Sequence, residues 1–121
     1  MRTVKFGKTL VGVKVSPLTP FLYKREFKSD LLGDIMGMQK LVDNPENIDI
    51  ILLLQITYAM AKTVEYGKDF PDFEGWLASL DAIDLGDNEF ILGIMEEAME
   101  GLFRSGAKSF QKQAAESSRK I

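Results

Sequence analysis

The sequence predicts a mainly α-helical, compact single domain with a short antiparallel β-hairpin at its N-terminus. Its 121 residues are a usual length for one domain, and a chain of that length buries a core without disulfides or metals. Near the N-terminus apolar residues alternate with polar ones, whereas farther along they recur at helical spacing. Residues 1–104 are expected to form the domain, and residues 105–121 a helix extension or a flexible tail.

The alternation near the N-terminus predicts two strands within residues 3–15. A glycine turn signal, Gly7-Lys8, separates the two apolar sets, which is typical of a hairpin. The sets are Val4 and Phe6 before the turn, and Leu10 or Val11, Val13 and Val15 after it. A two-stranded hairpin is not stable by itself. We therefore expect it to pack on helices or on the edge of another chain.

Capping residues followed by proline or acidic residues mark the predicted helix starts. These starts are Thr19-Pro20, Ser29-Asp30, Asn44-Pro45-Glu46, Pro71-Asp72 and Asp87 or Asn88. The helices are predicted to reach Phe27, Val42, Tyr66, Leu80 and Phe103, with a loop over residues 81–86. Two glycines, Gly33 and Gly37, lie four apart in the second helix. Each costs about 1 kcal/mol of helix propensity relative to alanine, so they predict close packing against a neighbouring helix.

The third predicted helix is the candidate core helix. Its middle, Ile50–Ile56, is apolar on nearly every side, which is typical of a central, buried helix. The longer apolar stretch Ile48–Ala61 falls short of the roughly 20 residues that span a bilayer. The N-terminal residues contain no continuous apolar run of the kind found in a signal peptide. We therefore expect a cytoplasmic protein without membrane association.

The residue types exclude most catalytic chemistry. The chain has no Cys and no His, so it lacks thiolates, the usual general base and the commonest metal ligands. It contains no glycine-rich phosphate-binding motif. The acidic run Asp81-x-x-Asp84-x-x-Asp87-x-Glu89 departs from the EF-hand pattern, and we interpret it as a solvated loop followed by a helix cap. The sequence therefore predicts no enzyme activity, no cofactor and no metal; an enzyme using only carboxylates and lysine is the weakest alternative.

Charge is unevenly distributed although the net charge is only −3. Residues 2–28 hold seven bases and one acid, residues 69–100 hold ten acids and no base, and residues 104–121 hold five bases and one acid. The sequence pI of about 5.0 argues against a nucleic-acid partner. The asymmetry either holds one chain together or brings together opposite ends of two copies. The candidate residues for such self-association are Lys5, Lys8, Lys14, Asp81 and Asp84.

The segment Ser16–Met38 contains an ordered set of short motifs. A Thr-Pro pair with apolar neighbours is followed by Y-[KR]-x-x-F and then D-[LI]-x-x-D, read here as SPLTPFLYKREFKSDLLGDIMGM. Farther along come Phe73, Trp76 and Leu77, with acids at Asp81 and Asp84. In this order, after a short hairpin, the motifs resemble the tail assembly chaperones of long-tailed bacteriophages and prophages, chiefly those of Gram-positive hosts. The similarity in order reaches about Phe103.

The resemblance implies a function through protein–protein interaction. Such chaperones bind the tape measure protein in the infected or lysogenic host cell, keep it soluble, help recruit tail tube subunits and are absent from the finished virion. The alternative is a non-catalytic helical adaptor or regulatory protein of the bacterial or phage cytoplasm.

The last predicted helix carries the candidate client-binding surface. Its apolar residues form a stripe at helical spacing: Phe90, Ile91, Ile94, Met95, Ala98, Met99, Leu102 and Phe103. Methionine adapts to irregular partners, and so small a chain has limited core to cover the far end of the stripe. We therefore expect the client or partner to contact Met95, Met99, Leu102, Phe103 and Phe110. A homo-oligomer is expected as well.

Overall fold

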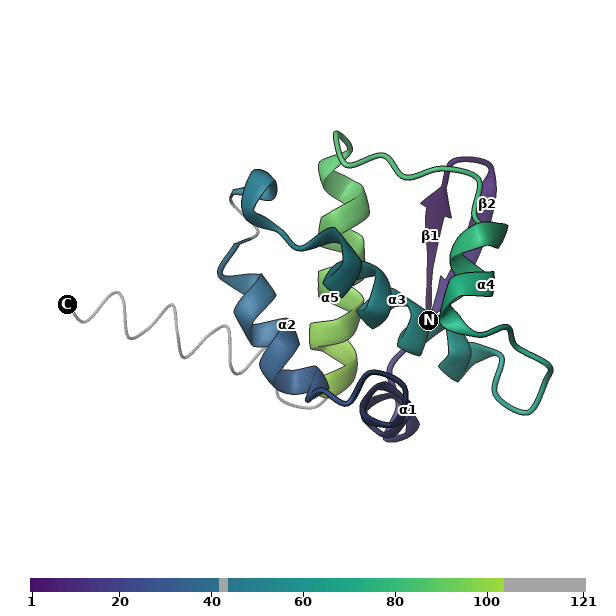
Figure 1. Cartoon of the computed structure of the whole chain (residues 1–121). Helices are drawn as coiled ribbons and strands as arrows, with labels where there is room; N and C mark the ends of the chain where they lie inside the picture. Colours follow the sequence, from purple (N-terminus) through teal and green to yellow (C-terminus); the bar gives the residue numbers. More distant parts are fainter. Residues whose placement is uncertain (42–43, 104–121) are drawn as a thin grey trace.

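The computed structural model describes residues 1–41 and 44–103 (Figure 1). In chain order its elements are β1 (Arg2–Phe6), β2 (Thr9–Val13), α1 (Leu18–Phe27), α2 (Leu31–Gln39), a 3-10 turn (Pro45–Asn47), α3 (Ile50–Val64), α4 (Phe73–Ser79) and α5 (Asn88–Leu102). This order confirms the mainly α fold class and the N-terminal hairpin. The predicted helix extension or tail over residues 105–121 lies outside the described residues.

Two helices hold the hairpin in place. The central helix α3 packs on α1 and on β2, while α5 packs on β1 and on α2 (Figure 1). The inner faces of both strands are buried, as the alternation predicts: Val4, Phe6, Val11 and Val13. Of the two candidates for the start of the second apolar set, Val11 is buried, and Leu10 is 63% exposed. The hairpin is thus stabilised by helices of its own chain.

Aspartates cap the helices at three of the predicted starts. The side chains of Asp30, Asp72 and Asp87 accept hydrogen bonds from the backbone N–H groups of Gly33, Gly75 and Glu89. Each bond satisfies a donor that the first helical turn leaves without an intrahelical partner. These starts are confirmed because capping depends only on residues within one turn.

The other two starts are wrong. Helix α1 begins at Leu18, and Thr19 lies inside it, completely buried. The Thr19 hydroxyl lies 2.7 Å from the Thr63 hydroxyl on α3, so it links two helices instead of capping one. Asn44-Pro45 starts only the 3-10 turn, and α3 begins after Asp49, whose carboxylate accepts from Leu52 N–H. Ile48 lies between the 3-10 turn and α3 and is buried. The interruption between these two elements therefore lets the Ile48 side chain enter the core.

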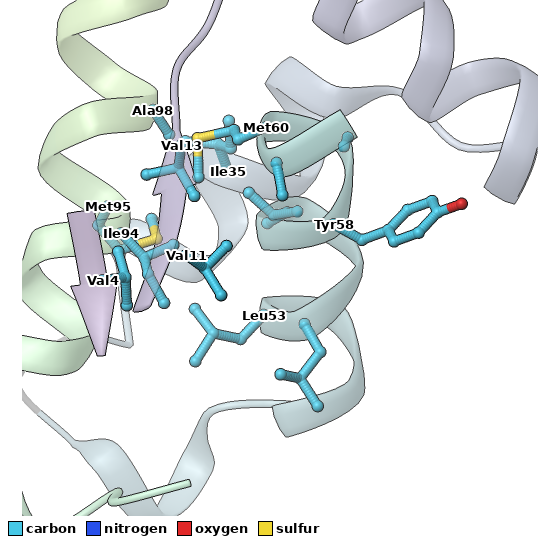
Figure 2. Close-up of a cluster of buried hydrophobic side chains, with 14 of the residues drawn as sticks. Val4, Val11, Val13, Ile35, Leu53, Tyr58, Met60, Ile94, Met95 and Ala98 are labelled. Atoms are coloured by element: carbon cyan, nitrogen blue, oxygen red, sulfur yellow. The ribbon is translucent and has the colours of Figure 1, made fainter. Parts of the chain in front are cut away.

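The apolar core surrounds α3 and the inner face of the hairpin. Leu53, Ile56 and Met60 are completely buried, which confirms α3 as the core helix. Its first turn differs, because Ile50 and Ile51 are 39% and 53% exposed. Figure 2 shows Leu53 and Met60 facing Val13, Ile94 and the other labelled apolar side chains, while Tyr58 extends from the opposite side of α3.

Tyr58 belongs to a second, aromatic part of the core. Its ring centroid lies 5.4–5.9 Å from those of four other rings: Phe27, Phe70, Phe73 and Trp76. Its hydroxyl donates to the Pro71 carbonyl at 2.7 Å. Burial, with the nearby charges of Glu26 and Asp72, raises the pKa of Tyr58 to about 12. The tyrosine therefore stays neutral at any physiological pH and fixes the loop that precedes α4.

The close-packed glycine of this fold is not one of the predicted pair. Gly33 and Gly37 are exposed, and a Cβ added to Gly37 would meet nothing within 4 Å. The prediction is wrong because α2 packs through the opposite side, which carries Leu31, Ile35 and Met38. A Cβ on Gly101 would instead overlap Cβ of Val15. The absent side chain of Gly101 thus lets α5 approach the segment after β2.

Replacing these two glycines by alanine is expected to have opposite effects on stability. Gly37→Ala should raise the free energy of unfolding by up to about 1 kcal/mol, because helix propensity improves in open space. Gly101→Ala should lower it by about 1–3 kcal/mol, because overpacking outweighs propensity. Urea denaturation of the two variants beside the wild type measures both. Stabilisation by Gly101→Ala would contradict the close approach to Val15.

Candidate protein-binding site

The predicted client-binding residues separate into two groups along α5. Met95 is 2% exposed and belongs to the core, so in this structure it does not form part of an accessible surface, contrary to the prediction. Met99, Leu102 and Phe103 are half-buried at the C-terminal end of the helix. Phe110 lies outside the described residues. The apolar stripe is thus mostly core, and only its last turn remains as a candidate surface.

A cleft lies beside this last turn. It has a volume of about 320 Å³ and separates the end of α5 from the start of α1. Among the described residues it is lined by Val15, Ser16, Pro17, Pro20, Gly101 and Leu102. We call it the α5-end groove. Because its lining is mainly apolar and proline supplies no N–H donor, it suits an apolar side chain better than a charged one.

Local hydrogen bonds fix the wall of the α5-end groove opposite α5. Ser16 N–H donates to the Thr19 hydroxyl at 3.0 Å, and Leu18 N–H donates to the Ser16 hydroxyl at 3.1 Å. Thr19 in turn contacts Thr63 of α3. This wall is therefore tied to the core helix, whereas the other wall is the final turn of α5, closed by the bond from Phe103 N–H to the Met99 carbonyl.

Two of the five candidate self-association residues meet within one chain. The backbone N–H of Lys8 donates to the Asp81 carboxylate at 2.8 Å, and Asp81 N–H donates to the Thr9 hydroxyl at 3.1 Å. Gly7, at φ 64°, has no room for a Cβ beside this carboxylate. Asp81 therefore caps the hairpin turn. Lys5, Lys14 and Asp84 are exposed, and the Asp84 side chain accepts from Gly86 N–H.

Arg2, together with the N-terminal ammonium 3.5 Å from Glu97, forms ion pairs between the basic end and the acidic flank, and sequence reasoning did not single it out. Its guanidinium lies 3.0 Å from the Glu96 carboxylate, 3.8 Å from Glu97 and 4.0 Å from Glu100. The sequence left open whether the charge asymmetry holds one chain together or joins two copies, and these ion pairs lie within one chain. The three glutamates lie on one side of α5 because Glu97 follows Glu96 directly and Glu100 comes four residues after Glu96, about one helical turn along.

A second polar cluster ties α1 to α2. The Tyr23 hydroxyl donates to the Asp34 carboxylate at 2.7 Å, and the Ser29 hydroxyl donates to the same oxygen at 2.6 Å. Burial and then the hydrogen bond and charge of Asp34 raise the pKa of Tyr23 above its usual range. The phenol therefore remains a donor, and the cluster has a structural role in positioning the two helices.

Within residues 1–41 and 44–103, no three acidic side chains converge in the manner of a metal site. Every buried side-chain nitrogen or oxygen there has a hydrogen-bond partner. No helix of this part is long and apolar enough to cross a membrane. No protein-family model, curated protein or solved structure matches the chain. Its function is therefore inferred from its own residues and their geometry.

Proposed function

We propose that this protein is a tail assembly chaperone of a long-tailed bacteriophage, which binds the tape measure protein as its client and helps recruit tail tube subunits. The observation that carries the proposal is the α5-end groove, an apolar cleft beside half-buried Leu102. The ordered motifs of Ser16–Met38 support it from the sequence side. In this proposal the protein acts in the cytoplasm of the host cell and is absent from the finished virion.

The geometry suits a helical, apolar client. Burying one large aliphatic or aromatic side chain in the cleft would contribute about 1.5–3 kcal/mol, so two or three such anchors along a client helix give a useful affinity. Met99, half-buried on the same turn, is unbranched and adapts to different client side chains. A long client with recurring apolar positions would thus be covered by many copies of one small protein.

Copies arranged along one client would also contact each other. We include a homo-oligomer in the proposal, with the exposed charged side chains of Lys5, Lys8, Lys14 and Asp84 as candidate contacts. The fifth candidate, Asp81, is exposed as well, but its carboxylate accepts a hydrogen bond from the backbone N–H of Lys8 at the hairpin turn.

Co-expression tests the client proposal. We expect the wild type to keep in solution a fragment of the tape measure protein that is encoded by a neighbouring gene. The two proteins should also co-purify. Phe103→Asp should abolish this effect, because a charge beside the α5-end groove opposes burial of an apolar client side chain. The circular dichroism spectrum of the variant should remain helical, since Phe103 is only half-buried.

Leu32→Asp is the matched control, because Leu32 is 43% exposed on α2 and does not line the groove. It should retain full solubilisation. A wild type that leaves the fragment insoluble and does not co-purify with it contradicts the chaperone proposal. If Phe103→Asp instead unfolds the protein, Phe103 belongs to the core and the client-binding surface lies elsewhere.

A further inference from the structure

One edge of the hairpin offers backbone groups that the described part of the chain leaves unpaired. Phe6 and Thr9 flank the two-residue turn and are register partners, so they form a hydrogen-bonded pair. Because bonded and non-bonded pairs alternate along an antiparallel ladder, Val4 and Arg2 also bond to β2. The N–H and C=O groups of Thr3 and Lys5 therefore point away from β2.

The opposite edge of the hairpin confirms this alternation. By the same rule the backbone N–H and C=O groups of the even-numbered residues of β2 point away from β1. Lys14 is the next residue in that series, and its N–H donates to the Met60 carbonyl of α3. Helix α3 thus packs against β2 and is hydrogen-bonded to the chain directly beyond it. On the β1 edge, no hydrogen bond from residues 1–41 and 44–103 reaches the backbone of Thr3 or Lys5, and the sheet has two strands.

A groove runs along this β1 edge. Its volume is about 590 Å³, and α5 forms its other wall, within the 300–1,000 Å³ range of ligand-binding clefts. Val4 and Phe90 contribute buried apolar surface, and Leu92, 40% exposed, adds an accessible apolar side chain. We call it the β1–α5 groove. It lies on β1 and the first half of α5, apart from the α5-end groove.

Gly93 leaves one position on the α5 side of the β1–α5 groove without a side chain. A Cβ at this position would meet only the flexible side chain of Arg2, at ordinary contact distances of 3.6 and 3.8 Å. Packing within the described chain therefore does not require glycine there, although glycine weakens a helix interior relative to alanine. Its effect is to leave room at the groove wall, as glycine does where another backbone approaches closely.

The groove is acidic as well as partly apolar. The charged residues of its lining are two bases on the strand, Arg2 and Lys5, and three acids on α5 and its cap, Asp87, Glu89 and Glu96. Arg2 and Glu96 pair with each other, so the two acids Asp87 and Glu89 remain against the single base Lys5. A ligand that matches this groove therefore carries basic residues together with apolar ones.

We propose that the β1–α5 groove binds an extended segment of a partner protein that contains alternating apolar and basic residues and adds to β1 as a third strand. Thr3 and Lys5 supply the main-chain hydrogen bonds, and Leu92, the exposed apolar side chain of the groove, supplies apolar contact, as in other cases of strand addition. Glu89 supplies charge complementarity. This inference does not depend on the tail-chaperone proposal, because it uses a different surface and a different form of ligand.

The test uses a fluorescently labelled octapeptide of alternating valine and lysine, titrated with the full chain and followed by anisotropy. Wild type and Thr3→Ala are expected to bind it equally. Thr3→Pro should bind roughly 3- to 10-fold more weakly, because it removes one outward N–H. Position 3 tolerates proline because the Thr3 N–H makes no hydrogen bond to β2. Unfolding curves of the two Thr3 variants show whether the hairpin is intact.

A second pair of variants blocks the groove without touching the strand. Gly93→Leu should abolish binding, whereas Gly93→Ala should retain most of it. Failure of the peptide to bind the wild type overturns the proposal, as does equal binding by an octapeptide of alternating valine and glutamate. Unchanged binding in both folded Thr3→Pro and Gly93→Leu overturns it too. A wild-type dimer that Thr3→Pro dissociates, without peptide binding, assigns the edge to a second copy instead.

Discussion

Replacing Phe6 by alanine is expected to lower the free energy of unfolding by about 3–5 kcal/mol. The Phe6 side chain is completely buried. Its ring makes edge contacts with Trp76 at 5.9 Å and with Phe90 at 5.0 Å between centroids. One side chain thus joins β1 to α4 and α5, and a cavity in its place would weaken the contacts among three elements. A loss of this size is a large fraction of the stability of a small domain.

Urea denaturation followed by tryptophan fluorescence measures this loss. The chain has one tryptophan, Trp76, which is buried against Phe6, so its emission reports the same contact. Leu10→Ala is the matched control in the same hairpin: Leu10 is 63% exposed, and its removal should change the free energy of unfolding by no more than about 0.5 kcal/mol. Equal effects of the two substitutions would mean that the hairpin does not pack on the helices.

Leu53→Ala is expected to cost about 2–5 kcal/mol, because Leu53 is completely buried on the core helix and its loss removes both burial and packing. The side chain faces the hairpin and α5 in the centre of the apolar cluster (Figure 2). Little relaxation is expected there, since several elements surround the site. The midpoint of urea denaturation, followed by far-UV circular dichroism, gives the change.

Ile51→Ala provides the comparison for Leu53→Ala on the same helix. Ile51 is 53% exposed, so its substitution should cost well under 1 kcal/mol. Ala also has higher helix propensity than isoleucine, which offsets part of the loss. A cost for Ile51→Ala as large as that for Leu53→Ala would show that the first turn of α3 is covered by another molecule, such as a second copy.

The candidate sites were only partly predictable. The apolar stripe of α5 and its far end could be found by helical spacing, but spacing does not distinguish Met95, which is buried, from Met99, which is half-buried. That difference depends on which neighbours cover each turn. The β1–α5 groove was missed altogether, because an open strand edge has no residue signature and Gly93 resembles any other helical glycine in the sequence.

The sequence by itself determined the features that arise from local interactions. The alternation around Gly7-Lys8 established the hairpin and its inner face, and the aspartates at 30, 72 and 87 established three helix starts. The apolar middle of α3 identified the core helix. Each of these features depends on a periodicity or a cap within a few residues. Such local interactions form without any contribution from distant parts of the chain.

Tertiary structure decided the features that depend on residues far apart in the chain. Thr19 contacts Thr63 instead of capping a helix, and Gly101, not Gly33 or Gly37, makes the close approach to Val15. Asp81 caps the hairpin turn instead of serving an acidic surface. In each case a hydroxyl, a carboxylate or a missing side chain has several possible local uses of similar energy. The partner that packing brings within a few ångströms selects among them.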